Sequence, residues 1–198
     1  LQWIADSLKS RNVRVQVILL VEGANTFGAM DAGLLPGYLP GYKPTDKGLT
    51  GWEMLEKAGS NISALWIMGQ NPARDLFHSE AFTAALQKLD MLVVQDHILT
   101  ETARYAHVVL PSSTFAETEG TFTNTERRIQ RINPAIRRVG NSKADTDIII
   151  EAASLAGADF NYSKVEEILT EISNTVPQYQ GVTFDAIGPF GRYLGDLK

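Results

Sequence analysis

Polar residues that could bind a ligand follow two short apolar runs near the middle of the sequence. The first run ends in Gly69-Gln70-Asn71-Pro72 and the second in Gln95-Asp96. A glycine lets a ligand approach the backbone, and the side-chain amide of Asn71 offers a donor and an acceptor. The carboxylate of Asp96 could accept from ribose hydroxyls or from the N–H groups of a base. These residue types fit a polar head group, although Asn-Pro is also an ordinary turn and Asp96 could equally cap the next segment.

The elements that would position these residues form an alternation of strands and helices. Strands are predicted at 64–68, 91–95 and 107–110, with helices at about 51–59 and 77–88. The alternation predicts a parallel sheet with right-handed crossovers, and the apolar runs indicate strands buried on both faces. Open α/β sheets bind ligands in the crevice at the carboxyl ends of their strands, so both polar tips should share one crevice.

Boundary residues support several of the predicted helices. Thr50, with Glu53 three residues later, has the pattern of a capping box at the start of the first helix. A helix is predicted at 144–156, with Gly157 suited to ending it, and another at about 164–174.

The segments around this core have other patterns. A strand is predicted at 13–21, while the glycines and prolines of 23–48 exclude regular structure over most of that segment. A polar, irregular or hairpin-like segment is expected after residue 111. We therefore expect an α/β fold with a parallel Rossmann-like sheet and helices on both faces, plus a helical or irregular C-terminal extension. Residues 1–111 would form an α/β dinucleotide-type domain, and a polar hairpin, two helices and a tail at 112–198 would pack on it.

Composition argues against several kinds of chemistry. The 198 residues include no cysteine, so the chain itself has no disulfide, no cysteine nucleophile and no thiolate ligand for an iron–sulfur cluster. The three histidines lack the spacing of metal ligands, so we expect no metal site. The sequence also contains no recognisable Ser-His-Asp arrangement, so we expect no catalytic residue in it. The net charge of −5 argues against a general nucleic-acid binder. No apolar run reaches the roughly 18 residues that span a bilayer. The start at Leu1 suggests a fragment of a longer polypeptide.

A polar stretch at Thr121–Arg131 leaves two interpretations open. Its arginines could bind phosphate or carboxylate groups, or they could pair within a solvated hairpin. Glu117 and Glu119, just before it, are expected at the surface.

Five motifs in order resemble those of the molybdopterin oxidoreductase family, which includes formate dehydrogenase large subunits and the large iron–sulfur subunit of respiratory complex I. The resemblance covers about residues 20–194. The motifs are Gly23–Pro36 with Leu39–Tyr42, Gly69–Pro72, Val93–Ala103, Val108–Pro111 and Phe115–Gln130. Family members usually carry Asp at the position of His107.

The resemblance implies a cofactor site at the strand ends. In this family such a domain holds the guanosine end of a bis-molybdopterin guanine dinucleotide. Carried over by motif, the cofactor-binding residues would be Gly69, Asn71, Pro72, Gln95, Asp96, Thr100 and Thr102. The catalytic Cys or selenocysteine and the cluster cysteines of the family lie outside this segment. The chain would therefore be part of an oxidoreductase without catalysing by itself and without a cofactor of its own.

Two parent proteins fit the resemblance. Glu22–Asn25 and the run 48–68 favour the subunit of a complex I type NADH–quinone oxidoreductase, in which the domain serves mainly as scaffold; this is our main expectation. Thr125–Arg128 favours the alternative, the cofactor-binding part of a molybdenum or tungsten formate dehydrogenase alpha subunit, since complex I members often have Gly at Arg127. Expected partners are the rest of the polypeptide and other subunits of a redox complex, with no nucleic acid and no direct membrane insertion. The expected location is cytoplasmic, at the inner face of a bacterial membrane through partner subunits.

Overall fold

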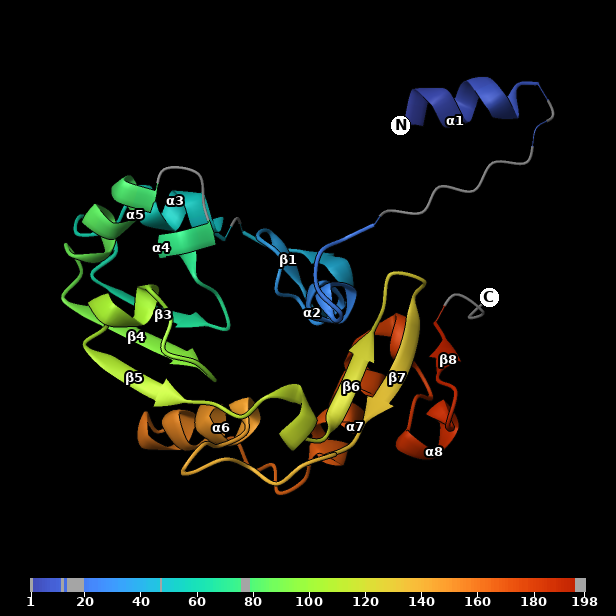
Figure 1. The fold of residues 1–198 in the computed structure, drawn as a ribbon. Coiled ribbons are helices and arrows are strands. Elements are labelled where there is room, and N and C mark those ends of the chain that lie inside the picture. Colours follow the sequence, from blue (N-terminus) through green and yellow to red (C-terminus); the bar gives the residue numbers. More distant parts are fainter. Residues whose placement is uncertain (1, 12, 14–19, 47, 76–78, 195–198) are drawn as a thin grey trace.

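A computed structural model describes residues 2–11, 13, 20–46, 48–75 and 79–194 (Figure 1). Most of the strand predicted at 13–21 lies outside the described residues. The helices and strands are α1 (Gln2–Lys9), α2 (Thr26–Asp31), β1 (Tyr38–Leu39), β2 (Lys43–Pro44), α3 (Gly51–Glu56), β3 (Ala64–Met68), α4 (Pro72–Asp75), α5 (Ser79–Leu86), β4 (Met91–Asp96), β5 (Val108–Pro111), β6 (Gly120–Thr123), β7 (Arg128–Ile132), α6 (Asp145–Leu155), α7 (Val165–Thr175), α8 (Phe184–Ile187) and β8 (Arg192–Tyr193). Short 3₁₀ helices are η1 (Pro40–Tyr42), η2 (Thr102–Tyr105), η3 (Phe115–Glu117) and η4 (Pro177–Tyr179).

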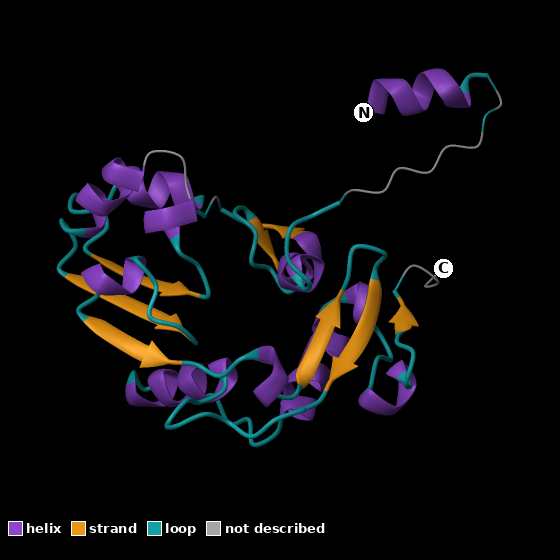
Figure 2. Cartoon of the chain, in the orientation of Figure 1, coloured by secondary structure: helices purple, strands orange, loops and turns teal. Residues whose placement is uncertain are grey.

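The three predicted strands form one parallel sheet, in the order β3-β4-β5. Trp66 of β3 is paired with Val93 of β4, which is paired in turn with Val108 of β5. All three carboxyl ends therefore lie at the same edge of the sheet, as Figure 2 shows. The α/β fold with a parallel sheet is confirmed.

A hydrophobic core fills one face of this sheet. Leu92 and Val94 of β4 are fully buried and pack with Leu86 of α5. The predicted capping box begins α3, because Thr50 Oγ1 accepts from the N–H of Glu53, whose carboxylate accepts from the N–H of Thr50 at 2.9 Å.

Polar contacts hold the other face of β4. Gln95 is fully buried; its side-chain oxygen accepts from the indole N–H of Trp66 at 3.1 Å. Its amide donates to Asp145, in the first turn of α6, at 2.6 Å. Gln95 thus links the sheet to the C-terminal extension.

The C-terminal extension has a hydrophobic core of its own. The predicted hairpin is present: β6 and β7 are antiparallel, and β8 pairs with β7 (Figures 1 and 2). Ile129 of the hairpin packs with Leu169 of α7 and Ile187 of α8. The helices predicted at 144–156 and 164–174 are α6 and α7, and α6 ends at the left-handed Gly157.

The segment 23–48 is more ordered than its composition predicts. It forms helix α2 and the short β1–β2 hairpin. The reason is tertiary, because Asn25, just before α2, accepts from the backbone N–H of Thr123 in β6 at 2.8 Å. The segment therefore packs on the C-terminal hairpin, across the domain division expected at residue 111, and that division remains a prediction.

A buried carboxylate fixes α2 to this hairpin. Asp31 is fully buried and accepts from Tyr42 at 2.7 Å, Arg127 at 3.0 Å and Tyr179 at 3.1 Å. Burial and the neighbouring Asp31 raise the pKa of Tyr42 above its ordinary value. Burial is the largest influence on the pKa of Arg127 and lowers it, but the charge of Asp31 and the hydrogen bonds to Asp31 and Tyr42 together outweigh burial and raise that pKa. Each partner thus stays protonated and able to donate.

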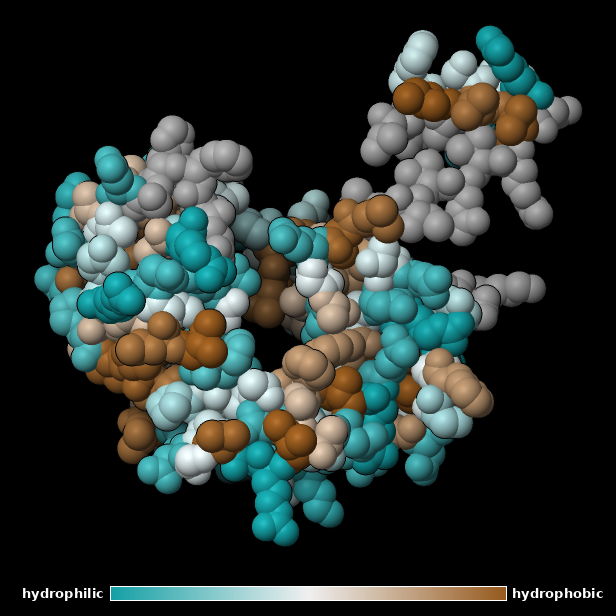
Figure 3. Space-filling view, viewed as in Figure 1, coloured by the Kyte–Doolittle hydropathy of each residue, from teal (hydrophilic) through white to brown (hydrophobic). Residues whose placement is uncertain are grey.

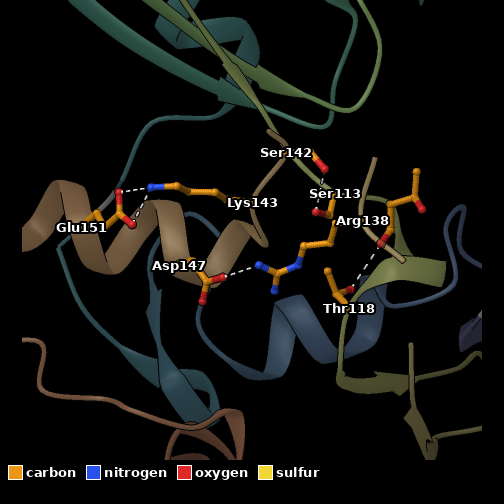
Figure 4. A network of polar contacts seen from close by, with 8 residues as sticks. Ser113, Thr118, Arg138, Ser142, Lys143, Asp147 and Glu151 are labelled. Carbon is orange, nitrogen blue, oxygen red and sulfur yellow. Dashed lines mark hydrogen bonds and ion pairs between the residues drawn. The ribbon is translucent and has the colours of Figure 1, made fainter. Parts of the chain in front are cut away.

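The loop between β7 and α6 is held by a second polar network (Figure 4). Its Arg138 and Lys143 pair with Asp147 and Glu151 of α6 at 3.0 and 2.6 Å. These pairs are exposed and contribute little to stability. Glu117, expected at the surface, is instead buried, and its carboxylate accepts from the backbone N–H of Val139 at 2.6 Å.

The pH dependence of the free energy of unfolding should show how much the buried carboxylate of Glu117 contributes to stability. Hydrogen bonds from the backbone and side chain of Thr114 hold the pKa of Glu117 below its ordinary value. A depressed pKa stabilises the fold above the unfolded value of about 4.3, and this stabilisation is lost as pH falls through the lower folded value. We expect Glu117→Gln to be less stable than the wild type at pH 7 and the difference to shrink below pH ~4. Urea unfolding at several pH values measures this. A constant difference down to pH ~3 would contradict it, and the exposed Glu126→Gln is the control.

Candidate functional site

A cleft of about 600 Å³ lies at the carboxyl ends of β3 and β4. Its remaining wall is the start of α2 and the residues before it. The lining residues are Glu22, Gly23, Thr26, Gly69, Gln70, Asn71, Arg74, Asp96, His97, Ile98 and Thr100. The space-filling view is hollowed between the α/β part and α2 (Figure 3). The cleft has the volume of a cofactor site and lies where the sequence predicts a ligand crevice.

Two glycines with left-handed backbone line this cleft. Gly69, directly after β3, has a left-handed φ of +59°, and no atom lies within 4 Å of the position that a Cβ would take. Gly23 on the opposite wall has a φ of +87°. A ligand can therefore approach the backbone closely at Gly69, whereas at Gly23 the hydroxyl oxygen of Thr26 lies 2.9 Å from the position of a Cβ.

Asp96 presents an acceptor to the cleft. The side chain is largely buried, and Oδ1 accepts from the N–H of Ile98 at 3.3 Å and lies 3.0 Å from Nδ1 of His97. Oδ2 has no hydrogen-bond partner among the described residues, yet it is not sealed from solvent. Asp96 can thus accept a hydrogen bond from a ligand.

Asn71 lines the cleft, but its side chain binds inward. Its oxygen accepts from the N–H and the hydroxyl of Thr102, at 3.1 and 2.8 Å. Its amide donates to Glu101 at 2.6 Å, and this hydrogen bond lowers the pKa of Glu101. The side-chain oxygen of Asn71, which the sequence suggested as an acceptor for a ligand, therefore joins the turn after β3 to η2 instead.

The remaining predicted site residues divide into two groups. Thr100 lines the cleft, and its hydroxyl accepts from the N–H of Ala103 at 3.2 Å, which leaves its own hydrogen for a ligand. Gln95 and Thr102 are fully buried, with their side chains bonded within the protein. Pro72 faces a separate apolar hollow of about 350 Å³. The structure thus brings four of the predicted site residues together at the cleft, namely Gly69, Asn71, Asp96 and Thr100. Pro72, Gln95 and Thr102 do not line it.

Sequence reasoning missed several lining residues. Glu22, Gly23 and Thr26 were not among the predicted cofactor-binding residues, although Gly23–Pro36 is one of the family motifs. Arg74 and His97 carried no spacing signal. Their position next to the two polar tips in the chain was the available clue.

Metal and membrane features are absent from the described part of the chain. Its residues include no group of three or more His, Asp or Glu side chains that could hold a metal ion. None of its helices is long and apolar enough to cross a membrane.

Comparison with known proteins identifies the family. The family model described as molybdopterin oxidoreductase matches residues 7–154. The chain belongs to the molybdopterin oxidoreductase family. Within it, the chain is 41% identical over 191 residues to subunit alpha of F420-dependent formate dehydrogenase 1 from Methanococcus maripaludis, covering 87% of this chain and 28% of that protein.

A second curated relative and one solved structure also resemble the chain. The chain is 44% identical over 182 residues to the F420-dependent formate dehydrogenase subunit alpha of Methanocaldococcus jannaschii, covering 81% of this chain and 27% of the relative. Among solved structures, acetylene hydratase from Pelobacter acetylenicus superposes with a TM-score of 0.56 at 18% identity, over 68% of this chain and 19% of that one. That structure supports the fold alone. The chain spans little more than a quarter of the length of these curated relatives.

The comparisons do not support our main expectation, a complex I subunit. The relatives named above are formate dehydrogenase subunits, so the alternative fits better. The structure offers a physical reason why Arg127 rather than glycine at this position can distinguish the two kinds of parent protein. Its φ of +64° is a conformation that glycine adopts freely, but here the guanidinium pairs with Asp31 and lies 5.0 Å from the ring centroid of Phe27. An arginine at this position makes contacts that a glycine cannot make.

Proposed function

We propose that this chain is the part of a formate dehydrogenase alpha subunit that binds the guanine nucleotide end of a molybdopterin guanine dinucleotide. The observation that carries the proposal is the cleft at the strand ends, which Asp96 lines. Membership of the molybdopterin oxidoreductase family and the named formate dehydrogenase relatives support it. When bound, the cofactor supplies the metal chemistry of formate oxidation.

The residues present fit such a nucleotide. Asp96 would accept from the N–H groups of the base, and Thr100 would donate its hydroxyl hydrogen. Gly69 would let the phosphate-bearing part approach the backbone, beside the guanidinium of Arg74. These residues bind and orient, and the reacting groups would be supplied by the cofactor and by the rest of the polypeptide.

The parent would work as one subunit of a redox complex. The names of the relatives, which call them alpha subunits, support this. A cytoplasmic location at the inner face of the membrane, reached through partner subunits, is part of the same proposal.

Asp96→Ala in the full-length subunit tests the nucleotide site. A buried donor of the base left without its acceptor costs about 1–3 kcal/mol, so affinity for guanosine monophosphate (GMP) should fall about 10- to 100-fold in cofactor-free subunit. Molybdenum or tungsten and guanine nucleotide content of the purified subunit should fall with it. The control is Asp90→Ala, an exposed carboxylate at the opposite end of β4. Unchanged GMP affinity and unchanged cofactor content in Asp96→Ala would refute the assignment.

A further inference from the structure

The α2 wall of the cleft is a segment too short to hold its own position. Helix α2 has six residues, and isolated helices shorter than about 12 residues are marginal in water. Of the residues that line the cleft, Glu22 and Gly23 precede this helix and Thr26 begins it. The hydroxyl of Thr26 donates to the carbonyl oxygen of Glu22, so these residues form one closed turn. Contacts with the rest of the protein must therefore fix where this turn lies.

Asn25 provides such a contact from within the turn. It occupies the N-cap position of α2, where an asparagine side chain commonly accepts from an N–H of the first helical turn, but it makes no such bond. Its side-chain oxygen accepts instead from the backbone N–H of Thr123 in β6, the strand beside α2 in Figure 1, at 2.8 Å. Thr123 is almost fully buried, so water has little access to this N–H if the acceptor is lost.

Gly28 leaves the space that the side chain of Asn25 occupies. A Cβ added to Gly28 would lie 2.1 Å from the side-chain oxygen of Asn25, and the three atoms nearest to that Cβ all belong to Asn25. A side chain at position 28 would therefore push Asn25 away from Thr123. Both residues belong to Gly23–Pro36, a segment that resembles a family motif, as does Asp31, which accepts from Arg127 at the other end of α2.

We infer that Asn25 is a positioning residue, whose contact with Thr123, in the space left by Gly28, holds the α2 wall where nucleotide binding needs it. The inference rests on the proposed function. Asn25 is not among the residues that line the described cleft, so it acts through Gly23 and Thr26 on either side of it in the chain. A wall that is already in place favours binding, because the ligand does not have to order it.

GMP binding to cofactor-free, full-length subunit, measured by calorimetry, tests this role. Asn25→Leu keeps the branched shape of the side chain and removes the acceptor, whereas Asn25→Asp keeps an acceptor for the N–H of Thr123. We expect Asn25→Leu to weaken GMP binding about 3- to 10-fold and Asn25→Asp to stay within about 2-fold of the wild type. Because Asp31 still holds the end of α2, the subunit should remain folded, which urea unfolding of each variant checks.

Gly28→Ala gives a second, independent measurement. In the wild-type background its Cβ should displace Asn25 and weaken GMP binding about as much as Asn25→Leu does. In an Asn25→Ala background the clashing atoms are gone and alanine favours a helix, so Gly28→Ala should weaken binding no further. The matched control is Gly51→Ala at the start of α3, where a Cβ meets no atom within 4 Å and GMP affinity should not change.

Each contrary outcome has a distinct meaning. Unchanged affinity in Asn25→Leu, an equal loss in Asn25→Asp, or additive losses from Gly28→Ala and Asn25→Ala would overturn the positioning role. A loss of affinity explained entirely by the unfolded fraction of the variant would overturn it as well. The proposed function would then still stand on the response to Asp96→Ala. Absence of saturable GMP binding by the wild type would overturn both.

Discussion

Asp31→Ala is expected to destabilise the protein by about 3 kcal/mol, because it leaves three donors without their buried acceptor. Asp31 is fully buried, and Tyr42, Arg127 and Tyr179 all donate to it. The side chain of Arg127 is only 30% exposed, so water can replace the lost partner only in part. Burial also raises the pKa of Tyr179, which keeps its hydroxyl protonated as a donor.

Equilibrium unfolding in urea measures this loss. Asp46→Ala, an exposed carboxylate in the same segment, is the matched control and should change stability by less than ~0.5 kcal/mol. A double-mutant cycle with Arg127→Ala should show coupling of about 0.5–3 kcal/mol. A loss below ~1 kcal/mol in Asp31→Ala, with an unchanged m value, would show that the network contributes little.

Leu92→Ala should cost a similar amount, about 3 kcal/mol, through a different mechanism. Leu92 lies on the central strand of the parallel sheet and is fully buried in the cluster that includes Leu86. Truncation removes apolar contacts and leaves a cavity that the packed strand and helix cannot close. Leu99→Ala, which alters a side chain that is 73% exposed, is the control and should be nearly neutral.

The two large losses should add. Leu92 belongs to the cluster under the sheet, while Asp31 bonds to residues around the separate C-terminal cluster. Sites without shared partners usually add within about 0.5 kcal/mol. A combined loss that departs from the sum by more than ~1 kcal/mol would mean that the clusters are energetically coupled.

The sequence was sufficient to predict the parallel sheet and the place of the cleft. The strands at 64–68, 91–95 and 107–110 were recognisable because each is an apolar run that ends in polar residues, and the structure confirms them within one or two residues. Helix α2 was missed because a contact between Asn25 and β6, 98 residues apart, stabilises it, and no local pattern encodes that contact.

The direction of individual side chains was beyond prediction. Asn71 has the chemistry of a ligand-binding residue, but its donor and acceptor meet Glu101 and Thr102 instead. Gln95 likewise turns to Trp66 and Asp145. The same amide satisfies a buried partner or a ligand equally well, so only the three-dimensional arrangement distinguishes the two.

The network around Asp31 also has a consequence for synthesis on the ribosome. Asp31 and Tyr179 are 148 residues apart, so at roughly 5–20 residues per second about 7–30 s separate their appearance. During that interval Tyr42 and later Arg127 become available as donors, but the contact with Tyr179 is still missing and the packing of α2 is incomplete. One wall of the cleft is therefore among the last parts to be completed in each new molecule, and any ligand that contacts both walls must bind after translation of this region has ended.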